Sequence, residues 1–161
     1  MKKILFFLLF LISGWCQPIH CEPEYTFKRL TMTDGMVSNY IVDIIQDGQG
    51  YIWIASESGL CKFDGINFTI YNSAYSALGS NALNVLFYNK ADNTIWIGTQ
   101  RNGISIFNCE TQTVTPYGVP GMITQDITDL SAAADGGIWI THYHLGIDYY
   151  SNRDKTITHY K

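Results

Sequence analysis

The sequence repeats itself every 43 residues, and this period constrains the fold more than any other feature. Trp53, Trp96 and Trp139 stand 43 residues apart in both intervals, and each lies between two isoleucines. A fixed period of about 40 to 50 residues with strand-like segments inside it is typical of a β-propeller or a similar array. The chain is therefore expected to lay down one small sheet in each period.

Each period contains the pattern of four antiparallel strands. A polar residue and a run of branched apolar residues predict a first strand, as at 39–45. Turn residues such as Asp47-Gly48 connect it to the second strand, which carries the tryptophan. A loop ending in glycine, a third strand with an aromatic residue, and a polar turn come before an outer fourth strand. Such sheets are propeller blades, which we expect at about 38–72, 80–117 and 124–160.

The predicted fold class is all-β: a partial β-propeller of three four-stranded antiparallel blades plus an N-terminal orphan strand. Residues Tyr25–Leu30 alternate like the outer strand of a blade, and no first three strands come before them. A closed ring needs about four to eight blades, so we expect each terminal blade to leave an uncapped apolar face. The chain is then either a fragment of a larger propeller or a module that oligomerises. Its expected partners are the remaining propeller blades or further copies of itself.

The N-terminus has the pattern of a signal peptide. Two lysines precede a nine-residue apolar run, Ile4–Ile12, which is too short to span a bilayer. We expect residues 1–16 to be the signal peptide and residues 17–161 to form the partial propeller, in the periplasm or otherwise exported. Lipidation of Cys16 and an uncleaved anchor are the alternatives. A membrane anchor is otherwise expected only if the chain is part of a longer sensor.

The charge argues against one class of partner, and the cysteine count predicts the state of the thiols. The full chain has 10 basic and 14 acidic residues, which gives a net charge of −4. Removal of the signal peptide takes away Lys2 and Lys3, which leaves 8 basic residues and a net charge of −6. The remaining basic residues are scattered, so nucleic acid is not an expected partner. Cys21, Cys61 and Cys109 are an odd number for an exported chain, so we expect free thiols, with a stray bridge as the alternative.

The first repeat, Asn39–Asp64, resembles the two-component regulator propeller repeat, and Phe27–Asn39 is similar to the start of such sensors. The resemblance implies the N-terminal fragment of the periplasmic sensor of a Bacteroidetes hybrid two-component histidine kinase. Such a sensor recognises a ligand, often an oligosaccharide, and relays the signal to a kinase. No kinase motif is present in this chain, so it is not expected to be an enzyme. The alternative is a stand-alone exported propeller that binds glycan or protein and oligomerises to close its ring.

The loop His142-Tyr143-His144 differs most from the corresponding loops of the other repeats, so these three residues are the candidate ligand-binding site. An ordinary variable loop is the alternative. A zinc site would need His159 or Asp148 as well, and neither a metal nor a cofactor is expected. Enzymatic acid/base chemistry would have only the two histidines, Asp43 and Asp129 to use. We therefore predict no catalytic, cofactor-binding or metal-ligating residue in this chain.

Overall fold

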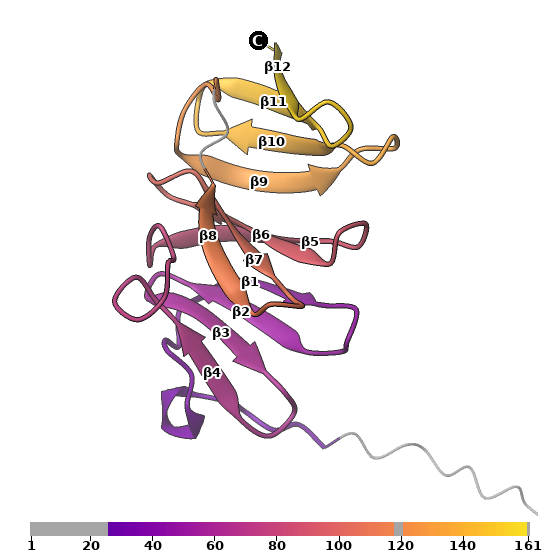
Figure 1. Ribbon diagram of the computed structural model, residues 1–161. Coiled ribbons are helices and arrows are strands. Elements are labelled where there is room, and N and C mark those ends of the chain that lie inside the picture. The colour runs from indigo at the N-terminus through magenta and orange to yellow at the C-terminus, as the bar shows by residue number, and fades with distance from the viewer. Residues whose placement is uncertain (1–25, 118–120, 161) are drawn as a thin grey trace, which may run out of the picture.

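The computed structural model describes residues 26–117 and 121–160, which form three sheets stacked one after another along the molecule (Figure 1). Each sheet is antiparallel, with its four strands side by side in chain order. Blade 1 contains β1 (Ile41–Gln46), β2 (Ile52–Ser56), β3 (Gly59–Phe63) and β4 (Phe68–Tyr71). Blade 2 contains β5 (Leu83–Asn89), β6 (Thr94–Thr99), β7 (Ile104–Asn108) and β8 (Thr113–Tyr117). Blade 3 contains β9 (Ile127–Ala132), β10 (Ile138–His142), β11 (Gly146–Ser151) and β12 (Thr156–Tyr160).

The predicted partial propeller of three four-stranded blades is confirmed. The expected signal peptide at 1–16 lies outside the described residues. Within the described residues, none of the helices is long and apolar enough to cross a membrane.

The tryptophans join each blade to the next one. Trp53 on β2 is fully buried, and its ring centroid lies 4.5 Å from that of Phe107 on β7. Trp96 on β6 is 2% exposed and lies 5.2 Å from Tyr150 on β11. In both interfaces the indole of one blade therefore packs against the third-strand aromatic ring of the following blade. Burying such a side chain contributes about 1.5–3 kcal/mol, so these contacts hold the stack together.

A buried carboxylate fixes the Trp53 indole. Asp47 lies in the turn between β1 and β2, and its Oδ2 accepts a hydrogen bond of 2.8 Å from Trp53 Nε1. Its Oδ1 accepts backbone N–H bonds from Gln49 and Tyr51, at 2.9 and 3.0 Å. One side chain thus closes the hairpin turn and satisfies the polar end of a buried ring.

A leading segment precedes the first strand of each blade and is anchored in the same way three times. The leading segments are residues 35–39, 77–81 and 121–125, and each places an apolar side chain against the sheets: Met36, Leu78 and Met122. In each, a backbone N–H donates to a side chain of the third strand: Val37 to Cys61 at 3.2 Å, Gly79 to Ser105 at 3.1 Å, and Ile123 to Asp148 at 3.1 Å. Position 61 and its equivalents therefore serve as acceptors for the segment that leads into the blade.

The expected orphan strand is not formed by its described residues, Thr26–Leu30. A strand needs a neighbouring sheet edge, and here the chain instead turns through the 3-10 helix η1 (Met32–Asp34) onto the face of blade 1 opposite blade 2. Leu30 packs there against Met36, Ile54 and Cys61. This segment covers part of the outer face of blade 1, while Ile44 on the same face remains 60% exposed.

Two described cysteines, Cys61 and Cys109, are free and buried. Burial raises the pKa of the Cys61 thiol, and it raises the pKa of Cys109 to about 11. Both residues fill apolar packing between or beside sheets, which agrees with the expectation of free thiols. Cys21 lies outside the described residues.

Candidate functional site

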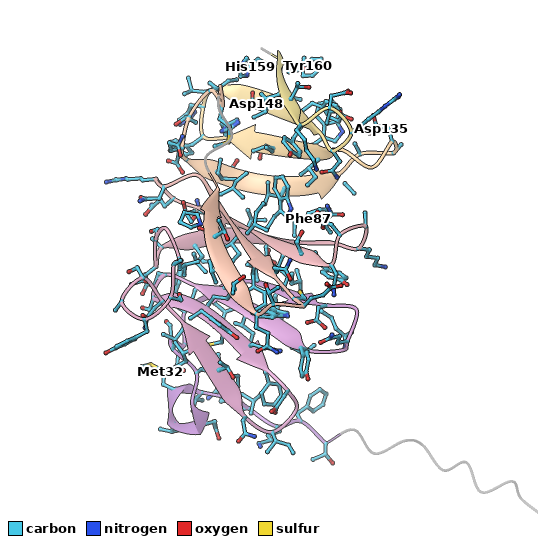
Figure 2. The ribbon with its side chains drawn as sticks, viewed as in Figure 1. Met32, Phe87, Asp135, Asp148, His159 and Tyr160 are labelled. Carbon is cyan, nitrogen blue, oxygen red and sulfur yellow. The ribbon has the colours of Figure 1, made fainter. Side chains whose placement is uncertain are left out.

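The structure separates the three residues of the predicted binding loop. His142 ends β10, and its side chain is completely buried. Its Nε2 donates to Asp148 Oδ2 at 2.9 Å, and Asp148 Oδ1 accepts a bond of 2.6 Å from His159 Nδ1. Asp148 is fully buried, and with His159 it lies in the upper part of blade 3 in Figure 2. The His142 ring therefore anchors β10 to β11 and has no surface available to a ligand in solution.

The zinc alternative requires His142 and His144 together with His159 or Asp148. The structure instead groups His142, Asp148 and His159 through hydrogen bonds, and His144 lies against Tyr143. His142 and His159 each use a ring nitrogen on the same carboxylate, and Oδ2 also accepts the Ile123 N–H. Among the residues that the structure describes, no three His, Cys, Asp or Glu side chains are grouped so that they could hold a metal ion. The geometry gives the zinc alternative no support.

Tyr143 is the residue of the loop that faces solvent with a large ring. It is 60% exposed, and its backbone N–H donates to Asp126 O at 3.4 Å. The His144 ring meets it edge-on at a centroid distance of 4.0 Å, and His144 has a φ of 60° in the turn. The tight turn therefore presents the tyrosine ring outward and places an imidazole against its edge.

Tyr143 lines a groove between blades 2 and 3. The cavity has a volume of about 410 Å³, and its other lining residues are polar: Asn84, Gln100, Arg101, Asp126 and Thr128. The groove thus offers a guanidinium, a carboxylate, two amides, a hydroxyl and one aromatic ring. Such a set can hydrogen-bond a polar ligand from several directions and pack against one apolar face of it.

Hydrogen bonds between blades 2 and 3 hold the two sides of this groove in place. Asn84 Nδ2 donates to Ile127 O at 2.8 Å, which connects the innermost strands of blades 2 and 3. Gly103 N, in the hairpin after β6, donates to Gln125 O at 2.8 Å. The groove walls are therefore fixed by hydrogen bonds between blades, which favours a preformed site over one that folds on binding.

The residues considered for acid/base chemistry are held apart by structural bonds. Asp43 Oδ2 accepts the backbone N–H of Leu86 at 2.7 Å, which ties blade 1 to blade 2. Asp129 Oδ1 accepts the N–H of Leu130, its own neighbour, at 2.8 Å. With His142 bonded to Asp148, the arrangement serves strand pairing and blade contact, and it does not form a pair of convergent catalytic groups.

Sequence reasoning found one lining residue of the groove, Tyr143, and missed five. Gln100 occupies in blade 2 the position that Tyr143 occupies in blade 3, one residue beyond the end of the tryptophan strand. From that equivalence the sequence could have predicted that Gln100 and its neighbour Arg101 lie in the same site as Tyr143. Asn84, Asp126 and Thr128 come from the starts of innermost strands, and no pattern in the sequence places them beside a loop of another blade.

Comparisons with known proteins agree with the repeat. Residues 35–58 match the sequence model of the two component regulator propeller family. Residues over 45% of this chain are 35% identical to histidine kinase P4 of Formosa agariphila, and the match covers 5% of that protein.

Solved structures resemble a longer part of the chain. The extracellular domain assigned to the hybrid two component system BT3049 of B. thetaiotaomicron is 35% identical over 83% of this chain, with a TM-score of 0.74. That likeness covers 20% of the solved chain, so this sequence spans about a fifth of the relative. The extracellular domain of BT4673 from the same organism is 23% identical over 77% of this chain and 18% of its own, with a TM-score of 0.66. At that identity it supports the propeller-like fold alone.

Proposed function

We propose that this chain, which carries a two-component regulator propeller repeat, forms part of the exported ligand-sensing propeller of a hybrid two-component system. The observation that carries the proposal is the 35% identity to an extracellular domain of such a system along 83% of this chain. In this proposal the chain binds a ligand outside the cytoplasm, and the binding changes the activity of a kinase elsewhere in the system.

The groove between blades 2 and 3 is the proposed binding site, and an oligosaccharide is the proposed ligand. Sugar hydroxyls both donate and accept, which suits the amides of Asn84 and Gln100 and the charged groups of Arg101 and Asp126. The apolar face of a pyranose ring can pack on the exposed ring of Tyr143. His144 lies at the edge of this site, beside the tyrosine.

Signal relay would pass through the contacts between blades. A ligand that bridges blades 2 and 3 favours the arrangement in which Asn84 and Gly103 keep their bonds to blade 3. In this proposal the propeller has two states, one with these bonds between blades 2 and 3 made and one with them broken. A ligand shifts the equilibrium between the two states only if it binds one of them more tightly than the other.

A glycan array probed with the purified chain, followed by calorimetric titration of any glycan that binds, tests the proposal. Tyr143→Ala should weaken binding by at least about tenfold, which corresponds to about 1.4 kcal/mol. Tyr75→Ala is the matched control, because Tyr75 is a 90% exposed tyrosine in the connection between blades 1 and 2. Binding that survives Tyr143→Ala unchanged would move the site elsewhere, and a chain that binds no glycan would contradict the ligand class.

A further inference from the structure

Two side chains of opposite charge line the groove between blades 2 and 3 without pairing with each other. Arg101 lies in the turn after β6 and is exposed, and Asp126 precedes β9 and is half-buried. The salt bridges among the described residues both join a histidine to Asp148, so no described carboxylate neutralises the Arg101 guanidinium. Asp126 bonds to Thr124 and Tyr143 through its backbone N–H and C=O. The groove therefore offers a ligand one cation and one carboxylate.

Hydrogen bonds fix the turn that carries Arg101. Thr99 is fully buried, and its Oγ1 donates to Gly103 O at 2.8 Å and accepts the Asn102 N–H at 2.9 Å. The Gly103 N–H in turn donates to Gln125 O of blade 3 at 2.8 Å. The backbone of Arg101 is therefore held in one place on the groove wall, and a ligand does not have to order the turn when it binds.

The corresponding turn of blade 1 closes in the same way without a basic residue. Ser56 Oγ donates to Gly59 O at 2.8 Å and accepts the Ser58 N–H at 3.1 Å. Two residues, Glu57 and Ser58, separate the ends of this turn, whereas three residues do so in blade 2, with Arg101 in the middle. The shorter turn keeps both hydrogen bonds and carries an acidic residue. Closing the turn therefore does not require Arg101, which leaves the groove as the place where its charge acts.

We propose that the groove selects oligosaccharides that carry an anionic group, either a uronate carboxylate or a sulfate, and that Arg101 determines this specificity. The planar guanidinium can donate two parallel hydrogen bonds to such a group. Asp126 accepts hydrogen bonds from hydroxyls, which neutral and acidic sugars share, so it does not distinguish the two classes. This inference rests on the proposed function, because it names the class of oligosaccharide for the same site.

A glycan array with neutral, uronate-containing and sulfated glycans is the first test on the purified chain, and we expect it to bind anionic glycans. Calorimetry then compares the anionic glycan that binds most tightly with the same glycan after its carboxylates are reduced or its sulfates are removed. Loss of the anionic group should weaken binding at least about tenfold, because charge-assisted hydrogen bonds are about twice as strong as neutral ones. The treatment that has this effect identifies carboxylate or sulfate as the recognised group.

Variants test whether Arg101 makes this distinction. Arg101→Gln should bind the acidic glycan and its neutral form about equally, and Arg101→Lys should keep part of the preference because it keeps the charge and loses the fork. Arg153→Gln is the matched control: it makes the same change in net charge at an exposed arginine in the turn between β11 and β12, outside the groove. Tyr143→Ala should weaken the binding of both forms by the same factor, because its ring packs on the sugar face.

Salt gives an independent readout of charge recognition. Sodium chloride should weaken the binding of the acidic glycan to the wild type and have little effect on Arg101→Gln, because salt screens charges at an exposed site. An array that binds only neutral glycans, or an Arg101→Gln variant that keeps the preference for the acidic form, overturns this inference and leaves the sensing role in place. A chain that binds no glycan contradicts the oligosaccharide ligand itself, and this inference with it.

Discussion

The hydrogen bond between Asp47 and Trp53 gives the sharpest test of how a blade is held together. Asp47→Ala removes the acceptor of the indole N–H and of two backbone N–H groups in the turn before β2. Gln49 is exposed and Tyr51 is half-buried, so water can replace the carboxylate as the acceptor for their N–H groups. The Trp53 ring is 0% exposed, so its N–H has no replacement partner.

The expected loss of stability follows from these environments. A hydrogen bond to a charged group contributes about 1.5–3 kcal/mol, and a buried donor left unsatisfied costs about 1–3 kcal/mol. We expect Asp47→Ala to lower the free energy of unfolding by about 3 kcal/mol. Trp53→Phe removes the same bond from the other side and also loses packing against Phe107. A double-mutant cycle isolates the shared bond, which should appear as a coupling energy of about 1.5–2 kcal/mol.

Urea unfolding followed by far-UV circular dichroism, at one fixed protein concentration, measures the four proteins of the cycle. Circular dichroism is preferred because the cycle removes a tryptophan fluorophore. Asp47→Asn is an informative third variant, since it keeps one acceptor for the turn. A coupling energy below about 0.5 kcal/mol would refute the reasoning, because it would mean that the buried indole does not depend on the carboxylate.

Three further predictions concern other parts of the stack. Gly98→Ala should destabilise the chain by about 1–3 kcal/mol in urea, since its Cβ would lie 2.5 Å from Val85 Cγ1 between blades 2 and 3. The hydrogen bond of 2.6 Å from Tyr149 to Asp135 raises the pKa of the phenol to about 12 and lowers the pKa of the carboxyl. The stabilisation by the phenol should be complete below its ordinary pKa of about 10 and lost as the pH rises through about 12. A titration of the tyrosinate absorbance, compared with that of Tyr149→Phe, should show one phenol that ionises at about this pH. Cys109, whose pKa is raised to about 11 by burial, should react with a thiol reagent at neutral pH only after denaturation.

The fold was predictable because its signals are local and repeated. The turn residues and the glycine-ended loops each lie within one hairpin, and the tryptophan recurs every 43 residues. The prediction of an outer strand at 25–30 is wrong over its described residues, 26–30, for the opposite reason. Its pattern was correct for a strand, but strand formation depends on a free sheet edge, and residues 26–30 instead lead onto the face of blade 1.

The candidate site was only partly predictable because it is shared between blades. Tyr143 drew attention as an unusual residue in its repeat, whereas Asn84 and Asp126 are ordinary polar residues that become neighbours only when blades 2 and 3 stack. His142 looked equally suitable from its chemistry. Its orientation toward Asp148 depends on the pairing of β10 with β11, which sets which side of the sheet each side chain faces.

The anchoring of each leading segment to the third strand has a consequence for how the protein forms. The three bonds join residues that are 24, 26 and 25 positions apart, so each blade completes its own tie over a short length of chain. Contacts at short separation close quickly because little loop entropy is lost. Blade 1 can therefore assemble as it leaves the ribosome or the export channel, and each later blade can add to a finished template.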